Sequence, residues 1–95
     1  MLIETPYKNL DTVTIKLTDS SEIVARLEDE NDTQLTLYKP LALIATEQGM
    51  GLSPFAFTIP ADAKVKINKS TVIFVHKTDA EMAKQYTKSA TGVAI

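Results

Sequence analysis

The residues best suited to chemistry in this sequence are an acidic cluster and a single histidine. The cluster holds four carboxylates: Glu28, Asp29, Glu30 and Asp32. Carboxylates are the ligands that magnesium and calcium prefer, so a cluster of this kind could bind a divalent cation. Its spacing lacks the glycine and the closing glutamate of a calcium loop. We therefore interpret residues 28–32 as a solvated turn between two strands and predict no metal site.

The histidine, His76, follows a short apolar run near the end of the chain. A general base needs an orienting partner and a nucleophile within reach. The sequence has no cysteine, no Gly-x-Ser-x-Gly elbow and no phosphate-binding loop, and Gly49-Met50-Gly51 alone indicates only a turn. We therefore predict that the protein is not an enzyme and uses no cofactor and no small-molecule substrate.

The elements that position these residues are mainly strands. Apolar residues recur at every second position from residue 13 onward, which is the pattern of strands with one buried face. Strands are predicted over residues 13–18, 22–28, 33–46, 55–68 and 71–75. Lys39-Pro40 should give the third strand a bend or an edge position, because proline cannot donate to a strand ladder. Residues 47–51 should form a loop, and residues 60–62 should interrupt the fourth strand.

The pattern changes to that of a helix after the last strand. Residues 78–81, TDAE, have the form of a capping box, in which Thr78 is the N-cap and Glu81 is the glutamate three residues later. Tyr86 falls on one helical face with the alanines of this segment. We expect a helix over residues 79–89 that covers a barrel end, lies on one ring face or binds a partner.

Short, strongly bent strands favour a small open barrel. At 95 residues the chain is expected to be a single domain over 1–95, with the barrel at about 13–76. Phe55, Phe57 and Phe74 are predicted to lie in the core or at a contact with another copy, since strand aromatics usually pack inward. The tyrosines are expected to be more open: Tyr7, Tyr38 and Tyr86. The unbroken apolar run 72–75 predicts contacts on both faces of the last strand.

Composition limits the classes of partner. The net charge is −2 and the pI is about 5.3, whereas proteins that coat nucleic acid without specificity are basic. Any RNA binding must therefore come from a local site. The lack of cysteine, of a signal-peptide pattern and of a membrane-length apolar run leads us to expect a cytoplasmic protein with no membrane partner.

Residues 13–37 resemble the first sequence motif of the Sm-like proteins. Leu17, Ile23 and Leu27 occupy apolar positions of that motif, and Ser21 and Ala25 stand where it has glycine. Where the motif has asparagine, this sequence has Gln34, and Asn31 is the alternative because the preceding loop varies in length.

Residues 67–75, INKSTVIFV, resemble the second Sm motif, in which Arg or Lys and then Gly precede a final strand. Asn68-Lys69 stand in place of that pair, and the polar, basic turn before a short strand is similar to the bacterial Hfq branch of the family. The chain as a whole resembles small Sm-like proteins of marine phage and ocean-sampled sequences.

This resemblance implies a mainly β fold, a strongly bent five-stranded open barrel of SH3 type, here with a short C-terminal helix. It implies that strand edges of neighbouring subunits pair to close a homo-oligomeric ring that binds single-stranded RNA and acts in RNA metabolism or regulation. The pore residues that it assigns are Asn31, Gln34, Asn68 and Lys69. Amide side chains offer a donor and an acceptor to a base edge, and a lysine can contact phosphate.

Two other interpretations stay open. The first is a structural or scaffolding ring, for example in phage assembly, that does not bind nucleic acid; the acidic balance and the missing Arg-Gly favour it. The second is a monomeric SH3-like barrel that binds proline-rich peptides. Such a barrel should display a cluster of aromatic side chains, and the sequence has no tryptophan and no such cluster.

Overall fold

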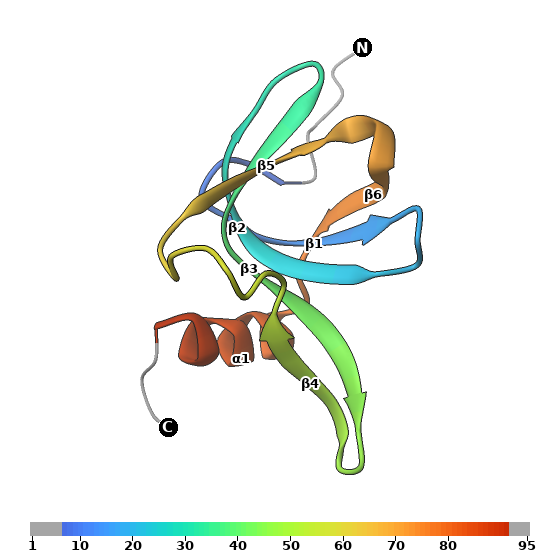
Figure 1. Cartoon of the computed structure of the whole chain (residues 1–95), viewed down its shortest axis with the longest axis vertical. Helices are drawn as coiled ribbons and strands as arrows, with labels where there is room; N and C mark the ends of the chain where they lie inside the picture. Colours follow the sequence, from blue (N-terminus) through green and yellow to red (C-terminus); the bar gives the residue numbers. More distant parts are fainter. Residues whose placement is uncertain (1–6, 92–95) are drawn as a thin grey trace.

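Strands make up most of the described part of the chain, residues 7–91 of a computed structural model (Figure 1). In chain order the elements are β1 (Thr12–Leu17), β2 (Glu22–Glu30), β3 (Gln34–Thr46), β4 (Gly49–Pro54), β5 (Lys64–Asn68), the 3-10 turn η1 (Lys69–Thr71), β6 (Val72–Lys77) and the helix α1 (Ala80–Thr91). The fold is therefore mainly β with a C-terminal helix, as the sequence predicts.

The six strands form one antiparallel open sheet in the order β4-β3-β2-β1-β6, and β5 also pairs with β3. β5 pairs with the first part of β3, residues 34–38, and β4 pairs with the last part, residues 41–46. Between these parts Lys39 has a φ of +49°. A left-handed residue followed by proline turns the strand, so the predicted bend at Lys39-Pro40 is confirmed. The sheet curls accordingly, and the β3–β4 hairpin projects from the rest of the molecule (Figure 1).

The hydrophobic core lies inside this curl. Its buried side chains are Val13, Ile15, Leu17, Ile23, Ala25, Leu27, Leu35 and Leu37. They are the alternating apolar positions of β1, β2 and the first part of β3, so the predicted period of two is confirmed for these strands. Tyr7, Ile67, Val72 and Val75 pack against the core from its margin.

The chain between residues 47 and 59 differs from the prediction. The sequence predicts five strands with a loop at 47–51, and the structure has six strands with β4 beginning at Gly49. Thr46 decides this, because its hydroxyl donates to the Gly49 carbonyl at 2.7 Å and accepts from the Gln48 N–H at 3.2 Å. Gly49 has a φ of +119°, which suits glycine. The turn between β3 and β4 therefore ends at Gly49, and Gly51 lies within β4 as the register partner of Ile44.

The predicted strand at 55–59 is wrong. No strand pairs with these residues, which form bends between β4 and β5. Phe55 is 36% exposed, Phe57 77% and Ile59 42%. Phe74 on β6 is also exposed, so none of the three phenylalanines belongs to the core. Their other predicted role, contact with another copy, stays a prediction.

The helix begins one residue later than the capping box predicts. Asp79, immediately before α1, accepts the Met82 N–H with its carboxylate at 3.3 Å. Thr78 is instead buried, and its hydroxyl lies 2.9 Å from the hydroxyl of Thr14 on β1. The Thr78 N–H donates to the Thr12 carbonyl at 3.0 Å, which prolongs the β1–β6 pairing by one residue. Thr78 thus bonds to β1 just beyond the end of β6, and Asp79 caps the helix.

Tyr86 fixes α1 against the bend of β3. It is only 4% exposed, so its predicted openness is wrong. Its hydroxyl accepts the Arg26 N–H at 3.2 Å and lies 2.8 Å from the carbonyl oxygen of Tyr38 and 3.0 Å from that of Lys39, so it can donate to either carbonyl. Burial raises the pKa of Tyr86 above its ordinary value, which keeps the hydroxyl protonated and able to donate.

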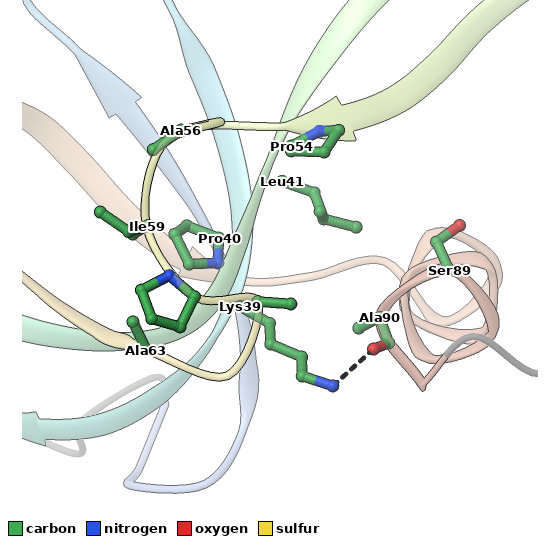
Figure 2. A pocket seen from close by; sticks show the side chains of 11 residues that line it. Lys39, Pro40, Leu41, Pro54, Ala56, Ile59, Ala63, Ser89 and Ala90 are labelled. Atoms are coloured by element: carbon green, nitrogen blue, oxygen red, sulfur yellow. Dashed lines mark hydrogen bonds between the residues drawn. The ribbon is translucent and has the colours of Figure 1, made fainter.

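Lys39 makes a second attachment between the bend and the helix. Its ammonium group donates to the Ala90 carbonyl at 2.8 Å, in the last turn of α1 (Figure 2). Beside this bond lies a cavity of about 180 Å³, bordered by the bend, by residues 54–63 and by the end of the helix. Lys39 and Ser89 supply its polar side chains, and the remaining lining residues are apolar. This cavity is therefore mainly apolar.

Candidate nucleic-acid interface

The β2–β3 turn and the start of η1 meet at the end of β3 opposite the β3–β4 hairpin. Gln34 on β3 is the register partner of Asn68 on β5. The Lys69 N–H donates to the Thr33 carbonyl at 2.8 Å, and the Asn31 N–H donates to the Gln34 carbonyl at 3.0 Å. The structure therefore brings together all the residues that the resemblance assigns to RNA: Asn31, Gln34, Asn68 and Lys69.

Asn31 shapes the turn with part of its side chain. The side-chain oxygen Oδ1 of Asn31 accepts hydrogen bonds from the Thr33 N–H at 2.9 Å, the Gln34 N–H at 2.8 Å and the Thr33 hydroxyl at 3.3 Å. An asparagine that bonds to backbone two and three residues on is the usual stabiliser of such a turn. This oxygen stabilises the turn, and the side-chain NH2 group of this exposed residue is the part that can contact a ligand.

The charge of Lys69 is paired within the chain. Its ammonium nitrogen lies 2.6 Å from Oε2 of Glu30, and the Tyr7 hydroxyl donates to the same oxygen at 3.3 Å. The Glu30 side chain is 26% exposed and that of Lys69 34%. Burial, followed by the contact with Glu30, raises the pKa of Tyr7 above its ordinary value. Tyr7, Glu30 and Lys69 form one connected group.

Sequence reasoning does not find Tyr7 and Glu30 as members of this site. Glu30 is the last residue of β2, and a register shift between Leu27 and Asp29 makes it the partner of the core residue Leu35. The period of two does not predict such a shift, so the sequence carries no signal for the place of Glu30. Tyr7 comes before β1 and belongs to no periodic segment, so the sequence carries no signal for its position.

An open cavity of about 450 Å³ lies over this group. Its lining includes two cations, Lys8 and Lys69, and two anions, Glu30 and Asp32. Opposite charges are therefore balanced at the site itself. Phosphate binding depends on an excess of cations, so the local field does not favour phosphate.

A scan against models of known protein families and a search of curated proteins find no match for this chain. Function must therefore be inferred from the site. In the described part of the chain no helix combines the length and apolar character needed to cross a membrane.

The acidic cluster is divided between different partners. Contrary to the predicted turn, Glu28, Asp29 and Glu30 lie within β2. Glu28 accepts from Arg26 at 2.7 Å and from Lys64 at 3.2 Å, while Asp29 is exposed. Among residues 7–91 no group of three or more His, Cys, Asp or Glu side chains could hold a metal ion.

The Glu28 ion pairs predict a pH-dependent contribution to stability. The hydrogen bond from Arg26, and then that from Lys64, hold the pKa of Glu28 below its ordinary value despite its burial. A lowered pKa stabilises the fold above the ordinary carboxylate pKa, and this stabilisation is lost as the pH falls through the lowered value. Glu28→Gln should lower the free energy of unfolding by about 0.5–1 kcal/mol at neutral pH and by nothing measurable in strong acid. Urea titrations of parent and variant at both pH values measure this, and a difference that persists in strong acid would contradict it.

Proposed function

We propose that this protein is an Sm-like subunit of a homo-oligomeric ring that binds single-stranded RNA at the β2–β3 turn and at the turn before β6. The observation that supports it most is the cross-strand pair of Gln34 and Asn68, joined by the Lys69–Thr33 backbone bond. Two sequence segments far apart in the chain thereby place amide and amino groups in one small area. These are the groups that read base edges and contact the backbone of single-stranded RNA.

The strand order supports ring assembly. The sheet ends at β6 on one side and at β4 and β5 on the other, and the described chain leaves both edges unpaired. On β6, Ile73 is 60% exposed and Phe74 48%; on the opposite side Met50 is 55% exposed. Unpaired, apolar edges are templates for pairing with another chain. We propose that β6 of one copy pairs with the β4–β5 edge of the next.

A closed ring multiplies the site. Each subunit contributes one set of amides and one Lys69, so weak contacts in each copy add along a bound strand. Because the charges at the site are balanced, base contacts should contribute more than phosphate contacts, and affinity should fall only gently as salt rises.

Asn68→Ala and Lys69→Ala are each expected to weaken RNA binding by about tenfold in the ring, with the mass of the ring unchanged. Removal of one good base-edge contact costs roughly 1–3 kcal/mol, and the site is repeated. Fluorescence anisotropy with a labelled single strand measures the affinity, and native mass spectrometry checks the ring. Lys84→Ala, at an exposed lysine of α1 outside both the site and the proposed ring edges, is the matched control. The proposed site is wrong if both variants bind RNA as the parent does.

A scaffolding ring without nucleic acid is the second candidate. One specific observation favours it: the ammonium group of Lys69 is already paired with Glu30. Native mass spectrometry of protein purified without nuclease separates the two. A ring that carries short RNA supports the proposed function, a ring without RNA favours the scaffold, and a 10.4 kDa monomer overturns both.

A further inference from the structure

Glu30 retains accepting capacity toward the cavity above it. Both of its contacts within the described chain, from Lys69 and from Tyr7, fall on Oε2. An ionised carboxylate offers about four lone-pair positions on its two oxygens, so the Glu30 carboxylate can accept further hydrogen bonds. The side chain is 26% exposed and borders the open cavity. The two positions that remain are on Oε1, so two adjacent donors of a ligand can share this oxygen.

Tyr7 supplies the aromatic face that the two sequence motifs lack. Tyr7 is half-buried, is one of the residues that line the same cavity, and is held by the bond from its hydroxyl to Glu30. Bases of single-stranded RNA stack on aromatic side chains, whatever the sequence of the strand. A base stacked on a ring tied to Glu30 has its edge close to the carboxylate.

The donor pattern of the site distinguishes the bases. Along its pairing edge guanine presents two adjacent donors, N2–H and then N1–H, and next to N1–H the acceptor O6. Uracil presents one donor between two acceptors, adenine one donor beside one acceptor, and cytosine one donor beside two acceptors. An acceptor facing Glu30 is repelled and left unpaired. The amide group of Asn31, whose oxygen is occupied in the turn, provides a donor for O6.

We propose that the cavity bordered by Tyr7, Glu30, Asn31 and Lys69 binds a guanine base of single-stranded RNA. The base stacks on Tyr7, donates from N1–H and N2–H to Oε1 of Glu30 and accepts at O6 from the side-chain NH2 group of Asn31. Lys69 neutralises the carboxylate, so the pair can be covered by the base without leaving an isolated charge. This inference rests on the proposed function and adds the base that the site selects.

The test compares short labelled oligouridylate with the same strand carrying one guanine, one inosine or one adenine, by fluorescence anisotropy. The guanine strand should bind roughly 5- to 150-fold more tightly than oligouridylate, the range of one bidentate base contact. Inosine, which lacks the N2 amino group, should lose part of this gain, and adenine all of it.

Glu30→Gln should bring the ratio of guanine to uridine affinity close to one, while overall binding is kept or strengthened because Lys69 is released to phosphate. Asp29→Asn removes the same charge from an exposed neighbour that does not line the cavity, and it should leave the ratio unchanged. Tyr7→Leu should weaken the binding of all four oligonucleotides. Circular dichroism verifies that each variant folds.

Two outcomes are distinguishable. Equal affinity of the parent for guanine-containing and all-uridine strands overturns the guanine site and leaves RNA binding intact. Failure of every strand to bind overturns the proposed function and this inference together.

Discussion

Ile73→Lys combined with Phe74→Lys should convert the proposed ring to a 10.4 kDa monomer that keeps its fold. Successive strand residues point to opposite faces, yet Ile73 is 60% exposed and Phe74 48%, so among residues 7–91 nothing fully covers either face of β6 at this point. The apolar run that predicts contacts on both faces therefore lacks them within one copy. Each such side chain contributes roughly 1.5–3 kcal/mol when buried, and a lysine on an edge strand opposes pairing.

Native mass spectrometry and sedimentation measure this outcome, and circular dichroism shows whether the monomer is folded. Leu10→Lys is the matched control, since Leu10 is 65% exposed but lies before β1, away from both unpaired edges. It should leave the assembly intact. A double variant with the parent's mass would show that β6 does not join the copies.

Tyr86→Phe should lower the free energy of unfolding by about 1–3 kcal/mol, a large loss for the removal of one oxygen atom. The Arg26 N–H and the carbonyls of Tyr38 and Lys39 all face the Tyr86 hydroxyl within 3.2 Å, and burial keeps water away from it. A buried backbone group left without a partner costs its desolvation energy. Urea denaturation followed by circular dichroism measures the change.

Tyr38→Phe provides the control for this loss. It removes the same atom from a half-buried tyrosine whose ring lies 4.5 Å under the Arg26 guanidinium, a contact that phenylalanine preserves. Its effect should stay within about 0.5 kcal/mol, as for most substitutions away from a buried bond. Equal losses in the two variants would mean that the Tyr86 hydroxyl does not anchor the helix.

The sequence is a good guide where a local rule and the tertiary structure agree. Alternation finds β1, β2 and the first part of β3, because their apolar residues do share one buried face. It fails at 55–59, since alternation tells which side chains can lie together and not whether a partner strand exists. Thr78 fails as a cap for a similar reason: its hydroxyl pairs with Thr14, which lies far away in the chain.

The candidate site divides in the same way. The resemblance to Sm-like proteins assigns Gln34 and Asn68 to one site, and the structure makes them register partners on β3 and β5. The Tyr7–Glu30–Lys69 group depends on where the segment before β1 crosses the end of the sheet. No local pattern of charge or hydrophobicity records that crossing, so only the folded chain shows it.

The double attachment of α1 has a consequence for local unfolding. Tyr86 binds the bend through its hydroxyl, and Lys39 binds the end of the helix through the Ala90 carbonyl. Neither α1 nor the bend can separate without breaking both. The helix and residues 38–41 should therefore open as one cooperative unit, and their backbone amides should exchange hydrogen for deuterium with a common opening free energy. The last turn of α1, which in most helices exchanges first, should be as slow as its middle.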